Sequence, residues 1–238
     1  MDYEEVTNMD NYLNYMKDYW DGRFESEERI WGERPSHTAE YALELFERRN
    51  IKRIMVPGAG YGRNTKFFSS KGYAVTGVEI SEEAYKIALA YDERTEFYKS
   101  SILDIQITNE SYDAIYCFNV LHLFRENERV LFLDKCFDWL KAGGVAFFTV
   151  FSTEEKSYGK GSEVEKNTFE SKQGRPVHYF SDQDIKDHFS KFDILETGLM
   201  KDTENHGDEG EHVHTLRYIF AKKFKFDSEK SESVKTFV

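Results

Sequence analysis

Cysteine is scarce in this 238-residue chain, which contains only Cys117 and Cys136. Both lie inside apolar segments and lack the paired spacing of a disulfide framework, so we expect buried, reduced thiols. The sequence also lacks the run of roughly 20 apolar residues that is needed to span a bilayer. Its first residues, MDYEEVTNMD, are acidic, whereas a signal peptide begins with basic residues. These features predict a cytoplasmic protein.

A basic stripe is missing as well. The 32 Lys and Arg residues are outnumbered by 44 Asp and Glu residues, the net charge is −12, and the basic residues are dispersed among the acidic ones. Proteins that bind nucleic-acid backbones or anionic membranes need clustered positive charge. We therefore expect neither nucleic acid nor a membrane as a partner.

The middle of the chain alternates short apolar runs with longer amphipathic stretches. β-Branched and aromatic residues indicate strands, and apolar residues at helical spacing indicate the helices between them. The predicted strands are residues 53–58, 73–80, 95–101, 112–120 and 144–152, and the predicted helices between them include 64–72, 81–93 and 126–140. This alternation predicts parallel βαβ units and therefore an α/β, doubly wound fold.

Further elements flank this alternating region. Aromatic residues between 10 and 30 follow a helical spacing, and Ser36 precedes an amphipathic segment as an N-cap. Residues 153–177 are polar with little periodicity, which predicts a long excursion that is either functional or disordered. The last predicted elements are a capped helix over 181–192 and two strands, 192–200 and 214–223, that form an antiparallel hairpin around an acidic loop.

A glycine-rich loop, VPGAGYGRNT, lies directly between a predicted strand and a predicted helix. Gly58, Gly60 and Gly62 allow a tight turn and a close approach of the backbone to a ligand at a helix N-terminus. The loop has the spacing GxGxG, with Arg63 where the dinucleotide fingerprint GxGxxG has its third glycine, so the pattern disfavours NAD. The loop indicates a nucleotide-like ligand, although an ordinary turn can also contain such glycines.

Glu79 supplies a second signal, because it closes the next predicted strand 21 residues after Gly58. A doubly wound sheet places a carboxylate at this position beside a bound ribose. The alternative is a solvated acid at a strand end. Since the loop and the acid occur in register within one βαβ unit, the pair favours ribose binding.

With these motifs the sequence resembles the class I S-adenosylmethionine-dependent methyltransferases, over residues 31–223. VPGAGYG resembles the first motif of that family, VEI the acidic end of its second strand, YDAIYCFNVLHLF its fourth-strand motif and LKAGGVAFFTVFS its fifth strand. WDGRF and WGERPS are similar to the small-molecule branch that includes tellurite-resistance and thiopurine methyltransferases. The resemblance implies a seven-stranded sheet with helices on both faces and an antiparallel last strand inside the sheet.

The resemblance also implies a domain organisation and a partner. Residues 1–226 would form a single methyltransferase domain, in which 1–36 provide an N-terminal helix and a segment covering the cofactor, and 153–180 a candidate lid. Residues 227–238 are charged and would form a flexible tail. The expected partner is a small-molecule substrate, and both a monomer and a homodimer are compatible with the sequence.

The resemblance assigns roles to individual residues. The backbone of Gly58, Ala59 and Gly60 would cradle the methionine part of S-adenosylmethionine, Glu79 would hold the ribose hydroxyls, Asn119 would lie beneath the methionine part and Trp31 would close over it. The family commonly has an acidic residue after the third strand for the adenine, but this chain has Ser101, so the contact falls to Ser101, Ile102 or Asp104. The remaining residues of the predicted cofactor site are Gly62, Asn64 and Ile80.

Methyl transfer from a sulfonium needs alignment of the acceptor and exclusion of water, and a base where the acceptor is protonated. The candidate bases are His178, His212 and His214, with Tyr158 and Arg175 as further candidates on the polar excursion. No metal is required. His206, His212 and His214 could together hold one, but these histidines could equally pair with nearby acidic residues. We interpret His122 as structural, and His37 and His188 as surface residues.

Two other functions remain open from the sequence. The chain could be a nucleotide-binding module or regulator that keeps the fold without turnover, because no diagnostic acceptor-site motif is present. An NAD-dependent oxidoreductase is disfavoured by the glycine spacing and by the lack of a recognisable catalytic Tyr and Lys arrangement. The acceptor could be a thiol, a metalloid oxyanion, or a nitrogen or oxygen nucleophile.

Overall fold

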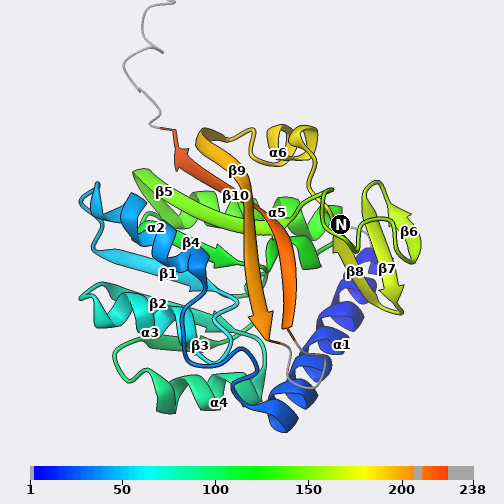
Figure 1. The fold of residues 1–238 in the computed structure, drawn as a ribbon, viewed down its shortest axis with the longest axis horizontal. Helices are drawn as coiled ribbons and strands as arrows, with labels where there is room; N and C mark the ends of the chain where they lie inside the picture. Colours follow the sequence, from blue (N-terminus) through cyan, green and yellow to red (C-terminus); the bar gives the residue numbers. More distant parts are fainter. Residues whose placement is uncertain (1–2, 206–210, 225–238) are drawn as a thin grey trace, which may run out of the picture.

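The computed structural model describes residues 3–205 and 211–224 and shows one seven-stranded sheet with helices on both faces (Figure 1). The strand order is β3-β2-β1-β4-β5-β10-β9. The strands of this sheet are β1 (Arg53–Pro57), β2 (Ala74–Glu79), β3 (Glu96–Lys99), β4 (Tyr112–Phe118), β5 (Leu140–Phe151), β9 (Phe192–Asn205) and β10 (Glu211–Lys223). The doubly wound α/β fold predicted from the sequence is confirmed.

Alternating apolar residues place a separate core on each face of the sheet. In β5, Phe148 faces a core with α5 and α6, whereas its neighbour Phe147 faces a core with α2, α3 and α4. Both rings are fully buried. The helices are α1 (Tyr3–Glu27), α2 (His37–Glu47), α3 (Arg63–Ser70), α4 (Glu82–Tyr91), α5 (Glu126–Trp139) and α6 (Asp182–His188), with a short 3-10 helix, η1, at Leu121–Leu123.

Serine caps begin three of these helices where the sequence predicted them. The hydroxyl of Ser36 accepts a hydrogen bond from the Ala39 amide, and that of Ser81 accepts one from the Ala84 amide. Ser181 and Asp184 form a reciprocal capping box at the start of α6. Local side-chain chemistry therefore fixes where these helices start.

The final hairpin closes the sheet in the predicted way. β10 pairs antiparallel with β5 on one side and with β9 on the other, so the last strand lies inside the sheet. Because β10 runs opposite to β5, it begins at the edge where β1, β4 and β5 end. This edge is where ligands bind in open α/β sheets.

Residues 162–178 form an ordered three-stranded antiparallel sheet, which the sequence did not predict. Its strands are β6 (Ser162–Glu165), β7 (Thr168–Lys172) and β8 (Arg175–His178). The predicted excursion over 153–177 is therefore ordered, and of its two alternatives the disordered one was wrong. The strands are only four or five residues long and mostly polar, and pairing between neighbours holds them together.

The N-terminal helix α1 lies beside this small sheet, across the edge of the large one (Figure 1). Its helical backbone begins at Tyr3, earlier than the aromatic pattern over 10–30 indicated. Leu13, Met16 and Phe24 are buried, in agreement with the apolar pattern over 10–30.

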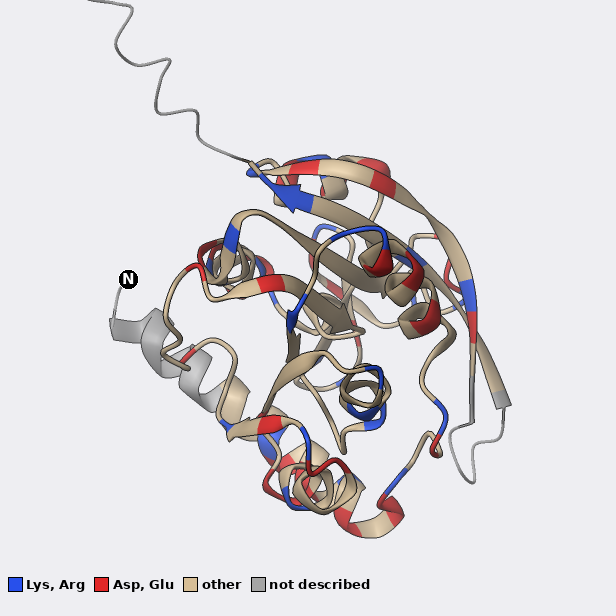
Figure 2. Ribbon diagram, turned by 90° about the vertical axis from the view of Figure 1, so that its left-hand side faces the viewer, with Lys and Arg blue, Asp and Glu red and all other residues tan. Residues whose placement is uncertain are grey.

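Two expectations from composition concern the cysteines and the charges. Cys117 and Cys136 are free and fully buried, as predicted. Acidic and basic residues are interspersed along the ribbon in the view of Figure 2. No helix within 3–205 and 211–224 is long and apolar enough to cross a membrane. The predicted tail over 227–238 lies outside the described residues.

Candidate functional site

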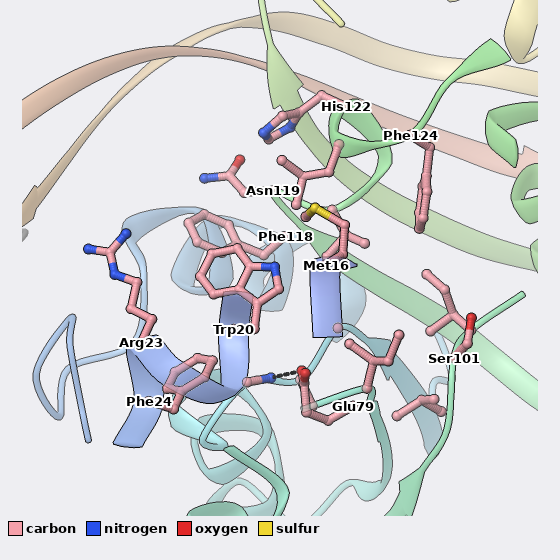
Figure 3. Close-up of a pocket in the computed structure, with 18 of the residues that line it drawn as sticks. Met16, Trp20, Arg23, Phe24, Glu79, Ser101, Phe118, Asn119, His122 and Phe124 are labelled. Atoms are coloured by element: carbon pink, nitrogen blue, oxygen red, sulfur yellow. Dashed lines mark hydrogen bonds between the residues drawn. The ribbon is translucent and has the colours of Figure 1, made fainter. Parts of the chain in front are cut away.

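A cavity of about 300 Å³ opens at the carboxyl edge of β1, β2 and β4 and is covered by α1 and β8. It has two ends (Figure 3). The glycine loop, Glu79 and Ser101 lie at one end, which we call the cofactor end. His122 and Phe124 lie at the other, together with Arg175, Val177 and His214, and we call this the acceptor end.

The glycine loop follows β1 and turns sharply into α3. Gly58 has a φ of +64°, and a Cβ there would lie 2.4 Å from Cγ2 of Val120, so the backbone and the space both require glycine. Gly60 has a φ of +57° and lines the cavity. The turn therefore brings bare backbone to the cavity surface.

Glu79 ties the loop to the next helix. One carboxylate oxygen accepts a hydrogen bond from the Gly60 amide and the other accepts one from the Ser81 amide, both at 2.8 Å (Figure 3 draws the first). Burial raises the pKa of Glu79 above its ordinary value, against the opposing effect of these amides. The carboxylate lines the cavity and has further lone pairs for a ligand's hydroxyl groups.

The structure brings most of the predicted cofactor residues to this cavity. The predicted residues that line it are Trp31, Gly58, Ala59, Gly60, Asn64, Glu79, Ile80, Ser101, Ile102 and Asn119. Gly62 lies behind the wall, where it caps α3 with a φ of +91°. Asp104 is exposed and outside the lining, so Ser101 and Ile102 are the better placed of the three adenine candidates.

Two polar side chains stiffen the cofactor end. The side-chain oxygen of Asn64 accepts a hydrogen bond from the Ser36 amide, which joins α3 to the start of α2. Asn119 has a φ of +55°, and its side-chain oxygen accepts a hydrogen bond from the Thr149 hydroxyl. These bonds hold both residues in place before any ligand binds.

An aromatic cover closes the cofactor end from the side of α1. Trp31 stacks on Tyr61 with ring centroids 6.1 Å apart, and Trp20 and Phe24 from α1 pack against Trp31. The buried indole Nε1 of Trp31 has no hydrogen-bond partner among the described residues. The sequence analysis missed Trp20 and Phe24 as site residues, although their spacing of four places them on one helix face.

A histidine and a glutamate meet at the acceptor end. Nδ1 of His214 lies 3.4 Å from a carboxylate oxygen of Glu155, and the other oxygen accepts a hydrogen bond from the Thr215 amide. Burial raises the pKa of Glu155, but the bonds from His214 and Thr215 outweigh it and keep the pKa below its ordinary value. Glu155 therefore stays ionised and orients the imidazole of His214.

His122 lies next to this pair, with Phe151 between the two histidines. The ring of Phe151 stacks on His122 at 4.3 Å and on His214 at 5.1 Å between centroids. His122 is 2% exposed, and its Nδ1 has no hydrogen-bond partner among the described residues. Although the sequence analysis interpreted His122 as structural, the side chain lines the cavity.

Because His122 is buried, we expect the folded protein to be less stable in acid. Burial, with a smaller effect of His214, lowers the pKa of His122 from 6.5 to about 3. Below about pH 6.5 the unfolded chain binds a proton at this residue and the folded protein does not. The free energy of unfolding therefore decreases as the pH is lowered through this window. We expect the unfolding free energy to be about 2 kcal/mol lower near pH 5 than near pH 7.5 from this residue alone.

Urea unfolding at the two pH values measures this effect. The His122→Phe variant preserves the ring stack with Phe151 and removes the titrating group, so its loss of stability in acid should be smaller. If the variant and the parent lose the same free energy, other groups account for the acid sensitivity.

Of the other candidates, Arg175 lines the cavity, whereas His178, His212 and Tyr158 lie outside its lining. His178 is 1% exposed and its Nδ1 lies 2.9 Å from the Thr168 hydroxyl, while His212 is exposed on β10. Tyr158 is 40% exposed and contacts Asn167. Of the proposed metal-binding trio, His206 lies outside the described residues. The expected surface location is found for His37, but His188 is half-buried between α6 and α5.

His178, Asp184 and His188 gather within 4.8 Å of one another, a spacing that a metal site would require. Both nitrogens of His188 are already engaged, however, because Nε2 accepts a hydrogen bond from Arg129 and Nδ1 contacts the Asp184 carbonyl. The guanidinium of Arg129 also places a positive charge beside the cluster. We interpret the cluster as part of the packing between β8 and α6, where Nε2 of His178 lies 3.7 Å from a carboxylate oxygen of Asp184.

The sheet, the glycine loop and the acid after β2 together are typical of α/β proteins that bind a nucleotide-like cofactor. Residues 55–148 match the family described as methyltransferase domain. The ubiquinone biosynthesis O-methyltransferase of Vibrio atlanticus is 27% identical over 123 residues, which are 50% of this chain and 51% of that protein. The chain spans about half the length of the curated relatives it matches.

Solved structures share the fold over a longer stretch. The 1,6-didemethyltoxoflavin-N1-methyltransferase of Burkholderia thailandensis, with bound 1,6-didemethyltoxoflavin and S-adenosylhomocysteine, has a TM-score of 0.65 and 17% identity, over 94% of this chain and 92% of that one. TehB from Haemophilus influenzae has a TM-score of 0.59 and 18% identity, over 77% and 62%. These structures share the fold that the resemblance predicted, and residues 55–148 match a methyltransferase domain.

Proposed function

We propose that this protein transfers a methyl group from S-adenosylmethionine to a small-molecule acceptor. The observation that carries the proposal is one continuous cavity with a bare glycine loop and Glu79 at one end and an oriented histidine at the other. When bound, S-adenosylmethionine supplies a methyl group that is already activated, so the protein has to align the acceptor and exclude water.

The residues at the cofactor end fit this cofactor. The space beside Gly58 leaves no room for a Cβ, and Trp31, which lines the cavity, has a buried Nε1 donor without a partner among the described residues. The Glu79 carboxylate would accept hydrogen bonds from ribose hydroxyls, and the loop amides at the N-terminus of α3 would face the methionine part. Ser101 and Ile102 would contact the adenine.

At the acceptor end we assign the role of base to His214. With its Nδ1 proton directed at Glu155, the ring keeps Nε2 as its basic nitrogen. S-adenosylmethionine would supply the methyl group to the acceptor's lone pair, and His214 would take up the proton that the acceptor loses. The α1 helix and the small sheet β6–β8 would act as the cover that keeps water out.

Calorimetric titration with S-adenosylhomocysteine, with NAD as the control ligand, tests the cofactor assignment. We expect micromolar binding of S-adenosylhomocysteine and no binding of NAD. Cofactor binding without methyl transfer to any acceptor would favour a regulator that keeps the fold without turnover. Binding of neither ligand would overturn the proposal.

Replacing Glu79 with Ala should weaken binding of S-adenosylhomocysteine by about 10- to 100-fold, the loss typical of a charge-assisted hydrogen bond. The variant also removes the acceptor for the Gly60 and Ser81 amides, so the loop loses its tie to α4. Titration of both proteins measures the change.

Glu82→Ala is a matched control for this variant. Glu82 is a neighbouring glutamate that pairs with Lys99 on the surface and lies outside the cavity lining. It should leave the affinity unchanged. An affinity of the Glu79→Ala variant equal to that of the parent would exclude the ribose assignment.

A further inference from the structure

Arg175 is the charged side chain of β8 that reaches the acceptor end of the cavity. It lies at the start of the strand, directly after the turn at Gly174. That turn packs on α1, where the Tyr15 hydroxyl donates a hydrogen bond to the Gln173 carbonyl and the Tyr15 ring would lie 3.2 Å from a Cβ at Gly174. Figure 1 shows α1 beside β7 and β8. The position of Arg175 is therefore fixed by the contact between α1 and the small sheet.

An aromatic ring, rather than a carboxylate, holds the guanidinium of Arg175. Its Cζ lies 3.8 Å from the centroid of the Tyr19 ring, which orients the charge by a cation–π contact. No Asp or Glu forms an ion pair with Arg175 within the described parts of the chain. The neighbouring acid Glu170 is already used, because it pairs with Arg125 and accepts a hydrogen bond from the Gly174 amide.

The charges along the cavity wall do not balance, although the whole chain carries a net charge of −12. The charged lining residues are Glu79, Arg23, Arg63 and Arg175. Arg23 pairs with Glu27, and Arg63 contacts the Trp31 carbonyl and the Trp31 and Phe118 rings at the cofactor end. Arg175 thus brings to the acceptor end a positive charge that has no ion-pair partner among the described residues, and a bound anion would pair with it.

The rest of the acceptor end is apolar except for the two histidines. Leu123, Phe124, Phe151 and Val177 provide most of the wall, and Nδ1 of His122 is a buried polar atom that lacks a partner among the described residues. Since a buried polar atom without a partner is costly, a ligand atom that bonds to His122 would stabilise the complex. The wall therefore fits a compact apolar body with one anionic group and one polar group.

From these contacts we propose that the methyl acceptor is a small anion with an apolar body, whose carboxylate or similar group pairs with Arg175. This inference rests on the proposed function and specifies the substrate class of the same site. The anionic group does not react. It fixes the acceptor so that its nucleophilic atom lies near His122 and His214.

Matched probes that differ only in charge test the proposal. The probes are hydroxy-, amino- and mercaptobenzoates and the corresponding benzamides, because each amide has nearly the shape of its acid without the charge. Transfer of radiolabelled methyl from S-adenosylmethionine measures kcat and KM for each probe. We expect methylation of at least one benzoate, with a KM well below that of its amide.

The Arg175→Met variant should raise the KM for the benzoate by about 10- to 100-fold, the loss of one charge-assisted interaction, and change the KM for the amide little. Arg175→Lys keeps the charge and should lie between the two. Lys172→Met removes the same charge from an exposed position of β7 and serves as the control. A merely structural role of Arg175 would affect acid and amide alike.

Titration of S-adenosylhomocysteine separates failure of this inference from failure of the proposed function. If S-adenosylhomocysteine binds but the amides are methylated as well as the acids, or neither set is methylated, the anionic acceptor is refuted while the cofactor assignment stands. An equal rise of KM for acid and amide in Arg175→Met would also refute it. If S-adenosylhomocysteine does not bind, the proposed function itself fails.

Discussion

The His214→Gln variant is expected to lower kcat for methyl transfer by about 100- to 10,000-fold, the usual contribution of a positioned general base. Glutamine can still hydrogen-bond to Glu155 but cannot take up the acceptor's proton. The measurement is the rate of methyl transfer at saturating cofactor and acceptor.

Two further variants complete this test. Glu155→Gln removes the charge that orients the imidazole and should reduce kcat less than His214→Gln does, because the base itself remains. His37→Gln is the control, since His37 is exposed on α2 and outside the cavity lining. A kcat for His214→Gln within tenfold of the parent would show that the acceptor needs no base or finds another one.

Gly58→Ala should lower the free energy of unfolding by about 2 to 4 kcal/mol, from overpacking and a left-handed backbone conformation. The added methyl group would lie 2.4 Å from Val120 Cγ2, at the wall that faces the cofactor. The loop must shift to relieve this contact, so binding of S-adenosylhomocysteine should weaken by more than about tenfold. Urea unfolding and calorimetric titration measure the two effects.

The chain offers controls that separate the two causes. Gly72 also has a positive φ, +91°, but an added Cβ would meet no atom within 4 Å. Gly72→Ala should therefore show only the backbone cost, about 1 kcal/mol, and unchanged binding. The double variant Gly58→Ala/Val120→Ala relieves the clash and should regain part of the affinity. Equal stability losses at Gly58 and Gly72 would contradict the steric account.

Much of the fold could be predicted because its signals are local. Ser36, Ser81 and Ser181 each cap a helix within three residues of themselves, and the alternation of strands and helices sets the parallel sheet. The glycine loop and Glu79 are also close in sequence, so their meeting could be predicted from one βαβ unit. The position of β10 inside the sheet followed from the family resemblance.

The acceptor end depends on contacts between distant segments. Glu155 and His214 are 59 residues apart, and Arg175 meets Tyr19 across more than half the chain. The spacing of apolar residues along the sequence does not indicate such contacts, because they depend on how β8 and α1 pack at the edge of the sheet. His122 could have been found, because it lies three residues beyond Asn119, just past the end of β4 at the ligand-binding edge.

The place of β10 between β5 and β9 also sets an order of assembly during synthesis. β9 leaves the ribosome first, yet within the described sheet its pairing partner is β10, so it has nothing to pair with until β10 follows. Until then the edge of β5 is bare as well, and both strands must join the sheet in one cooperative step. The residues that begin β10, His214 among them, therefore reach the site only when this step is complete. A nascent chain could form the cofactor end of the cavity while the acceptor end still lacks its base.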